Sequence, residues 1–277
     1  MKYARSAVLA AATKVSDCSL VDEQVPTISE AEFALQEFIT RYKICTFDLD
    51  SYQFPNQLET VLYALAKRRL LYAYATFIAD SNQSGSLVGI CDAARVVNMA
   101  GAALTLDCLD DAYERVTAGT GRPTLIMSHS RSLRTYRSLC RAAGIYQRVP
   151  WRWYDPARGR MVEGSVDAFN GTPWLANDFV NAGADPTEER TFFMVMGDDG
   201  GQGPTRGVTG IVPAAQGRNL FNRRRIEGVF AADAGAGAPD MLPGVDTWVS
   251  MPAGLALGSQ GALSIIENYT TVASCGG

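Results

Sequence analysis

"FPNQLETVLYALAKRRLLYAYATFIADSN", Phe54 to Asn82, is the stretch that decides the fold. Pro55 suits a first helical turn, and Glu59 complements the positive end of the helix dipole. Apolar residues then recur at roughly helical spacing, at Leu58, Val61, Leu62, Leu65, Tyr72, Ala75 and Phe77. No glycine or proline interrupts before the turn at Asp80–Gly85. The pattern predicts a helix of about 25 residues, about 37 Å long, which is unusually long for a globular domain.

The composition is that of an ordinary folded protein. The 277 residues are 47% apolar and 19% charged, with a formal net charge of −4, so no basic excess indicates a polyanion binder. The start, "MKYARSAVLAAATKVSD", is only partly like a signal peptide, because its apolar run is short and Lys14 follows. No segment is long and apolar enough to span a bilayer, so we expect a soluble protein without a membrane partner.

The sequence contains no clear motif for binding a metal ion or a cofactor. The six cysteines include no CxxC pair and the chain has one histidine, so we expect free thiols and no metal ion. The loop "GDDGGQGPTRG" has Arg206 where a dinucleotide-binding loop needs its third glycine. The aspartate pairs Asp198–Asp199 and Asp48–Asp50 are typical turn formers, although they could contact a divalent ion. We therefore expect no cofactor.

The remaining pattern mixes helices and strands. Thr105 to Val116 is predicted to form a helix capped by Thr105, followed by the buried strand "TLIMS" and a helix "RSLRTYRSLCRAAG" that Ser128 or Ser130 caps and Gly144 ends. "IYQRVPWRWYD" and "GSVDAFNGTPWLANDFV" alternate as strands, with "FNG" as a hairpin turn. "TFFMV" is predicted to be a buried strand, and 231–244 is predicted to be a loop. The C-terminal segment has a strand-like pattern. The fold class is α+β.

The segment 123–144 allows two functional interpretations, a serine hydrolase site and a DNA-binding helix, beside a purely structural role. His129 lies between Ser128 and Ser130, but no G-x-S-x-G elbow accompanies it, so a serine hydrolase is disfavoured. Four arginines lie on one predicted helical face: Arg131, Arg134, Arg137 and Arg141. They could hold DNA phosphates, face solvent, or pair with acidic residues of a neighbouring subunit.

The order of segments resembles the major capsid protein of tailed bacteriophages, the Hong Kong 97-type fold. The segment 56–90 is similar to that family's spine helix and the turn after it, and 103–144 to its axial-domain helix, strand and arginine-bearing helix. "VDAFNGTPWLANDFV" with "TFFMVMGDDGGQGPTRGV" resembles its strand pair and glycine-rich loop, and 246–270 its closing strands.

The resemblance implies an arrangement of domains. It implies an N-terminal arm at 1–20, a short E-loop within 21–45, a peripheral domain with the spine helix at 46–85, and an axial domain of mixed sheet and helices at 86–213. The chain would return to the peripheral domain at 214–277. The segment 214–244 has no clear counterpart in the family, so it would be an insertion. The arginine helix, with Arg68 and Arg69, becomes a candidate intersubunit face, and loop 200–206 a candidate for the symmetry axis.

It also implies a function. We expect a non-enzymatic shell protein that assembles with itself as pentamers and hexamers into the icosahedral head around double-stranded DNA, which it contacts non-specifically. A separate scaffolding protein, a portal protein and a decoration protein would be partners, in a virion assembled in the bacterial cytoplasm. Cross-linking through Lys43 is not expected. Alternatives are an encapsulin-like or gene-transfer-agent shell, a monomeric hydrolase, and a basic-helix DNA binder.

Overall fold

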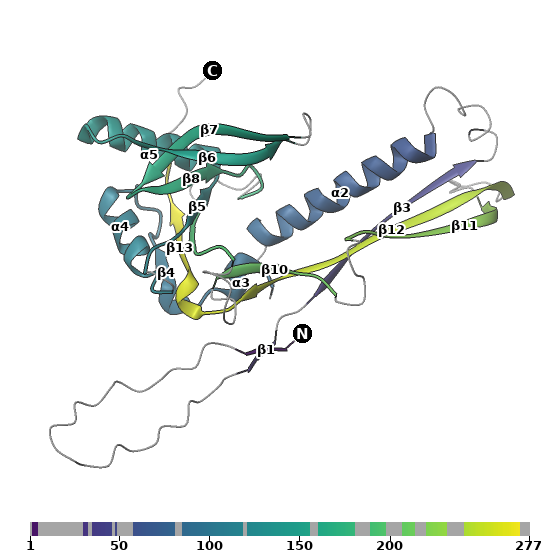
Figure 1. The fold of residues 1–277 in the computed structure, drawn as a ribbon, viewed down its shortest axis with the longest axis horizontal. Coiled ribbons are helices and arrows are strands. Elements are labelled where there is room, and N and C mark those ends of the chain that lie inside the picture. The colour runs from purple at the N-terminus through teal and green to yellow at the C-terminus, as the bar shows by residue number, and fades with distance from the viewer. Residues whose placement is uncertain are drawn as a thin grey trace, which may run out of the picture. The chain divides into compact units, whose positions relative to one another are not determined.

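The computed structural model describes residues 2–4, 30–32, 35–45, 48, 58–80, 85–118, 121–155, 160–180, 189–197, 207–213, 220–231 and 241–271. The chain divides into two compact units, and each is described by itself (Figure 1). The larger unit consists of Met1–Ala34, Ala79–Thr209 and Leu255–Gly277. The smaller unit consists of Leu35–Ile78 and Gly210–Gly254.

The long helix predicted from the sequence is present. It is α2, Leu58–Asp80, with 23 residues, and it runs beside a sheet of the smaller unit (Figure 1). Ala66 and Leu70 pack against Val249 and Met251 to form a small buried core. Phe38 adds edge-on ring contacts to α2, with its centroid 5.7 Å from that of Tyr74 and 5.6 Å from that of Phe77. Aromatic and aliphatic side chains therefore hold the helix on the sheet.

The sheet under α2 is built around β12, Met241–Leu257. Antiparallel strands β11 (Asn222–Ala231) and β3 (Gln36–Cys45) pair with it, and the short strand β10 (Val208–Ile211) is its third partner. Because side chains alternate along a strand, Val249 and Met251 face α2 while Trp248 and Ser250 lie on the opposite face. The loop predicted at 231–244 is corrected at both ends, since Ala231 ends β11 and Met241–Gly244 begins β12.

The larger unit holds a mixed sheet of seven strands in the order β4-β13-β9-β5-β8-β7-β6. The strands are β4 Val96–Asn98, β5 Leu125–Ser128, β6 Gln147–Asp155, β7 Arg160–Phe169, β8 Thr172–Ala176, β9 Glu189–Met194 and β13 Leu263–Tyr269. Two pairs are parallel, β5 with β8 and β13 with β4. The apolar run "LIMS" is a central strand, as its composition predicts.

Two helices cover one face of this sheet. Tyr113 of α4 (Leu106–Glu114) and Tyr136 of α5 (Ser130–Ala143) both meet Phe169, each with ring centroids 5.9 Å apart. Tyr136 also stacks on buried Trp174 at 4.5 Å. Thr105 caps α4 by accepting from the Cys108 amide, and Gly144 ends α5 with φ 69°, both as predicted.

The turn predicted from "FNG" joins β7 to β8. Asn170 has φ 49° and Gly171 has φ 80°, the left-handed pair that a two-residue hairpin turn requires. The two strands pair through Phe169 and Thr172 on either side of it. Asparagine and glycine tolerate this backbone best, which is why the dipeptide was a reliable sequence signal.

The remaining short elements include β1 (Lys2–Ala4), which pairs with β2 (Glu30–Glu32), and also α3 (Leu87–Ile90) and β10 (Val208–Ile211). Within the range 21–45 assigned to an E-loop, β3 pairs with β12 along its whole length. Within 214–244, β11 is a strand of the same sheet. The boundaries given for the arm, the E-loop, the two domains and the insertion stay predictions.

Candidate assembly surfaces

The histidine at the start of α5 is a capping residue. Its Nδ1 accepts hydrogen bonds from the Arg131 amide and from Arg131 Nε, both at 3.2 Å. This corrects the prediction that Ser128 or Ser130 caps the helix. Ser128 is buried instead, where it accepts from Trp174 Nε1 at 2.8 Å and donates to the His129 carbonyl. His129 is thus a polar residue at a strand–helix junction, as one of the sequence readings held.

Arg131 takes part in a buried network of polar side chains around Glu189 in the larger unit. Its Nε lies 2.7 Å from Oε1 of Glu189, a carboxylate with no solvent exposure. Ser132 donates to the same carboxylate at 3.2 Å, and the Tyr269 hydroxyl donates to Ser132 at 2.7 Å. Burial raises the pKa of Tyr269 well above its usual range, so the phenol stays protonated as a donor. Arg131 therefore neutralises a buried charge inside its own chain.

Arg137 is also paired within the chain. Its Nε lies 2.7 Å from Oδ2 of Asp167, a buried carboxylate on β7. The Tyr146 hydroxyl donates to the other oxygen of Asp167, and this hydrogen bond raises the pKa of Tyr146. Of the four predicted intersubunit arginines on α5, Arg134 and Arg141 are exposed residues, whereas Arg137 is held in its ion pair although its side chain is 43% exposed.

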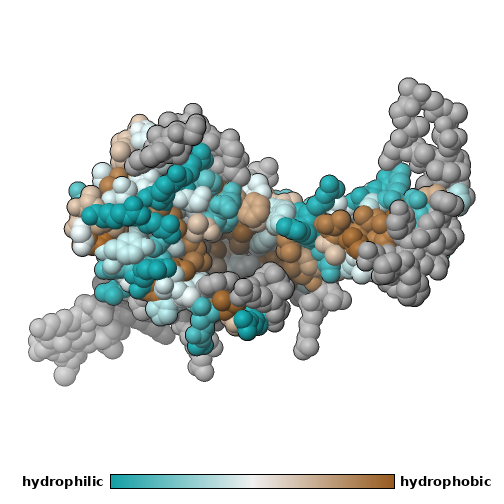
Figure 2. All heavy atoms as spheres, turned by 90° about the horizontal axis from the view of Figure 1, so that it is seen from above, coloured by the Kyte–Doolittle hydropathy of each residue, from teal (hydrophilic) through white to brown (hydrophobic). Residues whose placement is uncertain are grey.

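Arg68 and Arg69 lie on the exposed part of α2, among unusually exposed apolar side chains. Val61, Leu65, Leu71 and Tyr72 are each between 44% and 51% exposed. Arg68 Nε donates to the Tyr72 hydroxyl at 2.7 Å, which holds the guanidinium over the helix. Figure 2 shows apolar patches along this part of the surface, interleaved with hydrophilic side chains.

A pocket lies between this part of α2 and β3. It measures about 520 Å³, and Leu62, Leu65 and Tyr72 of the helix line it together with Arg68 and Arg69. On the strand side it is bounded by Thr40, Arg41 and Tyr42. The lining therefore combines apolar side chains with three arginines.

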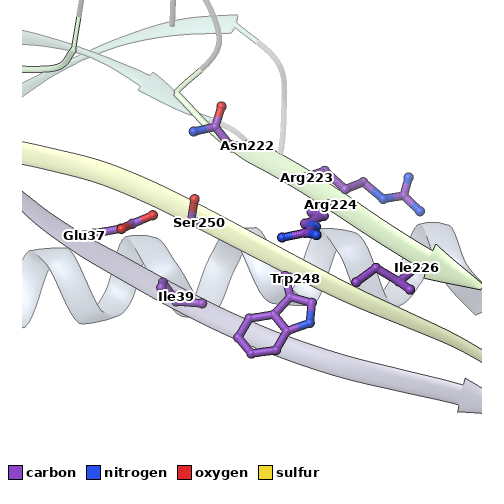
Figure 3. Close-up of a pocket in the computed structure, with 8 residues that line it drawn as sticks. All are labelled: Glu37, Ile39, Asn222, Arg223, Arg224, Ile226, Trp248 and Ser250. Carbon is purple, nitrogen blue, oxygen red and sulfur yellow. The ribbon is translucent and has the colours of Figure 1, made fainter. Parts of the chain in front are cut away.

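The sheet face opposite α2 is a second partly apolar surface, which the sequence analysis missed. A pocket of about 370 Å³ lies there, lined by Glu37, Ile39, Asn222, Arg223, Arg224, Ile226, Trp248 and Ser250 (Figure 3). Ile39 is 54% exposed and Trp248 is 38% exposed. The signal was the alternation in "DTWVSM", which places Trp248 on the face opposite Val249 and Met251.

Trp248 is held in place by its neighbours. The Arg41 guanidinium lies 4.8 Å from its ring centroid, and Arg41 Nε donates to Asp246 Oδ1 at 2.8 Å. The indole Nε1 lies 3.4 Å from Asp246 Oδ2. The hydrogen bonds from Arg41 hold the pKa of the Asp246 carboxyl below its usual range. A rigid, half-exposed tryptophan is the kind of residue that anchors protein interfaces.

The structure shows no metal site at the aspartates and cysteines that it describes. Asp48 is exposed, while Asp50, Asp198, Asp199 and loop 200–206 lie outside the described residues. Among the residues that the structure describes, no three histidine, cysteine or acidic side chains gather closely enough to hold a metal ion. Cys45, Cys91, Cys108 and Cys140 form no disulfide, and burial raises the pKa of the Cys91 thiol to about 12. Within the described part, no helix is long and apolar enough to cross a membrane.

The comparisons with known proteins rest on structure. No family model matches the sequence, and no curated protein matches it either. Among solved structures, the chain is similar to the holo-SrpI encapsulin complex of Synechococcus elongatus, with a TM-score of 0.65 and 18% identity over 90% of this chain and 80% of the other. The capsid of a native GTA particle gives a TM-score of 0.58 and 15% identity over 98% of this chain and 85% of that one.

A third similar structure is a satellite phage procapsid that includes the size-determination protein Sid. It gives a TM-score of 0.52 and 11% identity over 98% of this chain and 90% of the other. Identities this low establish a shared fold and no more. The fold is the Hong Kong 97-type α+β fold that the sequence predicted.

Proposed function

We propose that this chain is a major capsid protein, which assembles with copies of itself into the icosahedral head shell that encloses phage double-stranded DNA. The observation that carries the proposal is its likeness, over 98% of its length, to a GTA capsid and to a satellite phage procapsid. Function in such a shell is geometric, because one fold must occupy many near-equivalent positions. We accordingly propose that the chain is not an enzyme and that His129 has its role in capping α5.

The surfaces described above support assembly. Both sides of the smaller unit carry exposed apolar groups, Leu65 and Tyr72 on α2 and Ile39 and Trp248 on the sheet. Large exposed apolar residues grouped around basic rims are unusual for a protein that remains a monomer. The net charge of −4 also suits a container, since a strongly basic wall would hold packaged DNA tightly. Contact with DNA would be non-specific.

The proposal includes finer assignments that follow the resemblance. The copies would form pentamers and hexamers, with Arg134, Arg141, Arg68 and Arg69 at contacts between them. A separate scaffolding protein, a portal protein and a decoration protein would be the other partners. The shell would be assembled in the cytoplasm of a bacterial host and would end in the virion.

Microscopy of the expressed chain tests the proposal. We expect regular hollow particles by negative stain, formed by the chain alone or with the proteins encoded beside its gene. His129→Ala should assemble as the wild type does, because the capping bond is one of several that hold α5. A chain that stays monomeric in every setting, or a hydrolase activity that His129→Ala abolishes, would refute the capsid proposal.

An encapsulin-like shell is the second candidate, because the encapsulin complex gives a TM-score of 0.65. The two functions differ in what the particle holds. Particles purified from the natural source should contain long double-stranded DNA if the chain is a capsid protein. A protein cargo without nucleic acid would favour the encapsulin-like shell, and short random DNA would favour a gene-transfer agent.

A further inference from the structure

Helices α4 and α5 of the larger unit carry opposite and unbalanced charge. Helix α5 has four arginines and no acidic residue, and α4 has four acidic residues and no basic one. The acidic set is Asp107, Asp110, Asp111 and Glu114. One-sided charge on a helix face is tolerated by solvent, but two complementary faces on one chain are what a contact between copies of that chain requires.

The charged faces of the two helices point away from the core that joins them. Tyr113 of α4 and Tyr136 of α5 are both buried in edge-on contact with Phe169. Asp107, Glu114, Arg134 and Arg141 are all exposed. Each helix therefore buries an aromatic side chain and exposes charged ones, which are acidic on α4 and basic on α5.

The two faces do not neutralise each other inside the chain. The described ion pairs of α5 run from Arg131 to Glu189 and from Arg137 to Asp167, and that of α4 runs from Asp111 to Arg115. Within the described residues, no α5 arginine is paired with an α4 carboxylate. The chain therefore presents two unmatched faces that are complementary in sign.

The spacing of the exposed charges also matches. Arg134 and Arg141 are seven residues apart on α5, and Asp107 and Glu114 are seven residues apart on α4. Seven residues are two helical turns, so each pair lies on one side of its helix with its members about 10.5 Å apart along the axis. Both ion pairs can therefore form together when α5 of one copy lies along α4 of another.

We propose that α5 of one copy packs against α4 of the next, with Arg134 and Arg141 paired with Asp107 and Glu114. The inference rests on the proposed shell function and deepens it, because it names the two surfaces that meet. Different faces of the two copies meet, so the contact is heterologous, and it closes a ring when each copy is rotated by a whole fraction of a turn relative to the last. DNA phosphate is a poorer occupant of α5, because the acidic α4 of the same unit would repel it.

A charge-swap series in the full chain tests the inference. One variant carries Arg134→Glu and Arg141→Glu, a second carries Asp107→Arg and Glu114→Arg, and a third carries all four changes. Each of the first two should raise the protein concentration needed for half-assembly by about tenfold or more, because two attractive pairs become repulsive. The third should assemble at nearly the wild-type concentration, because every copy then has both faces reversed.

A mixture of the first two variants gives a sharper result. Like copies repel, so the two variants can join only in alternation, and a closed ring must hold an even number of copies. We expect rings of six but none of five in native mass spectrometry, and no closed icosahedral shell, which needs fivefold vertices. The third variant alone should form closed shells.

The controls separate misfolding from loss of the contact. Arg122→Glu with Arg160→Glu changes the net charge equally at two exposed arginines of the same unit and should leave assembly unchanged. Circular dichroism melting should show each variant folded. If the α4 reversal melts early, since Arg at position 107 opposes the helix dipole, Asp107→Asn with Glu114→Gln replaces it and should also weaken assembly.

Three outcomes would overturn the inference. Normal assembly of the Arg134→Glu, Arg141→Glu variant would show that α5 is not in a contact. Weak assembly that the four-fold swap fails to restore would show that α4 is not its partner. Normal particles that lose only their DNA would assign α5 to nucleic acid. In all three the wild type still forms shells, whereas a wild type that forms none would refute the proposed function itself.

Discussion

Arg131 and Arg134 are three residues apart on α5, yet they lie in different environments. Arg131 neutralises Glu189, which has no solvent exposure, whereas Arg134 is exposed. Arg131→Ala would leave a buried carboxylate without its cationic partner, so we expect the free energy of unfolding to fall by about 2–3 kcal/mol. Arg134→Ala, the matched control, should change it by about 0.5 kcal/mol or less. Urea denaturation of the unassembled chain measures both, and equal effects would contradict the assignment.

Asp246 should make the stability of the smaller unit fall at acidic pH. Its carboxyl accepts from Arg41, and these hydrogen bonds hold its pKa below the usual 3.8. A native pKa below the unfolded one means that the contribution is complete above about pH 4. It is then lost as the pH falls through the lowered native pKa.

Asp246→Asn tests this sign. We expect the variant to be less stable than the wild type by about 1 kcal/mol at pH 7, with the difference shrinking as the pH falls through the lowered native pKa of the wild-type carboxyl. Thermal melts over this range of pH measure it. Glu163→Gln is the control, because its ion pair with Arg152 is exposed, at 66% and 72%. A difference that grows on acidification would contradict the pKa assignment.

At the scale of the element, α2 should separate folding from assembly. Leu70 is 2% exposed in the core with Val249 and Met251, while the adjacent Leu71 is 44% exposed and Leu65 is 51% exposed. Leu70→Ala should cost about 2–4 kcal/mol of stability through the cavity it leaves. Leu65→Ala and Leu71→Ala should cost less than about 1 kcal/mol, because little is buried.

The second readout of this series is particle yield. If the exposed face of α2 is covered by other chains in the shell, Leu65→Ala should lower the yield while the unassembled chain stays as stable as the wild type. Leu70→Ala should lower both together. Unchanged yield in Leu65→Ala and Leu71→Ala would show that this face remains in solvent after assembly.

Several elements with a strong local signal were predicted correctly from the sequence. The uninterrupted apolar pattern gave α2, the Asn170–Gly171 dipeptide gave its turn, and Thr105 and Gly144 marked helix ends. It failed where tertiary contacts decide. Whether Arg131 faces solvent depends on Glu189, which lies 58 positions away in the chain. His129 caps α5 because it is the extended residue between β5, which ends at Ser128, and the helix, which begins at Ser130.

At the scale of the molecule, the candidate surfaces differed in how far the sequence could reach them. The arginines of α5 could be placed on one helical face by counting, because a helix has a fixed period. The Trp248 surface could not, since it needs β3 beside β11 and β12, and β3 comes from a distant part of the chain. Within one strand, the sequence shows only that apolar and polar residues alternate. That alternation does not say which face of the sheet another element covers.

Trp248 reports whether that sheet face is buried in the assembled state. It is 38% exposed in the single chain, while Trp174 is 1% exposed. If another chain covers the face, acrylamide should quench tryptophan fluorescence less in particles than in unassembled protein, because apolar contact excludes the quencher. Trp248→Phe keeps an aromatic ring at the site and should abolish most of that difference. A difference that persists in Trp248→Phe would place the protected tryptophan elsewhere, and equal quenching of wild-type particles and single chains would leave this face in solvent. Either result would remove the sheet face from the assembly surfaces and leave α2 as the one contact surface argued for the smaller unit.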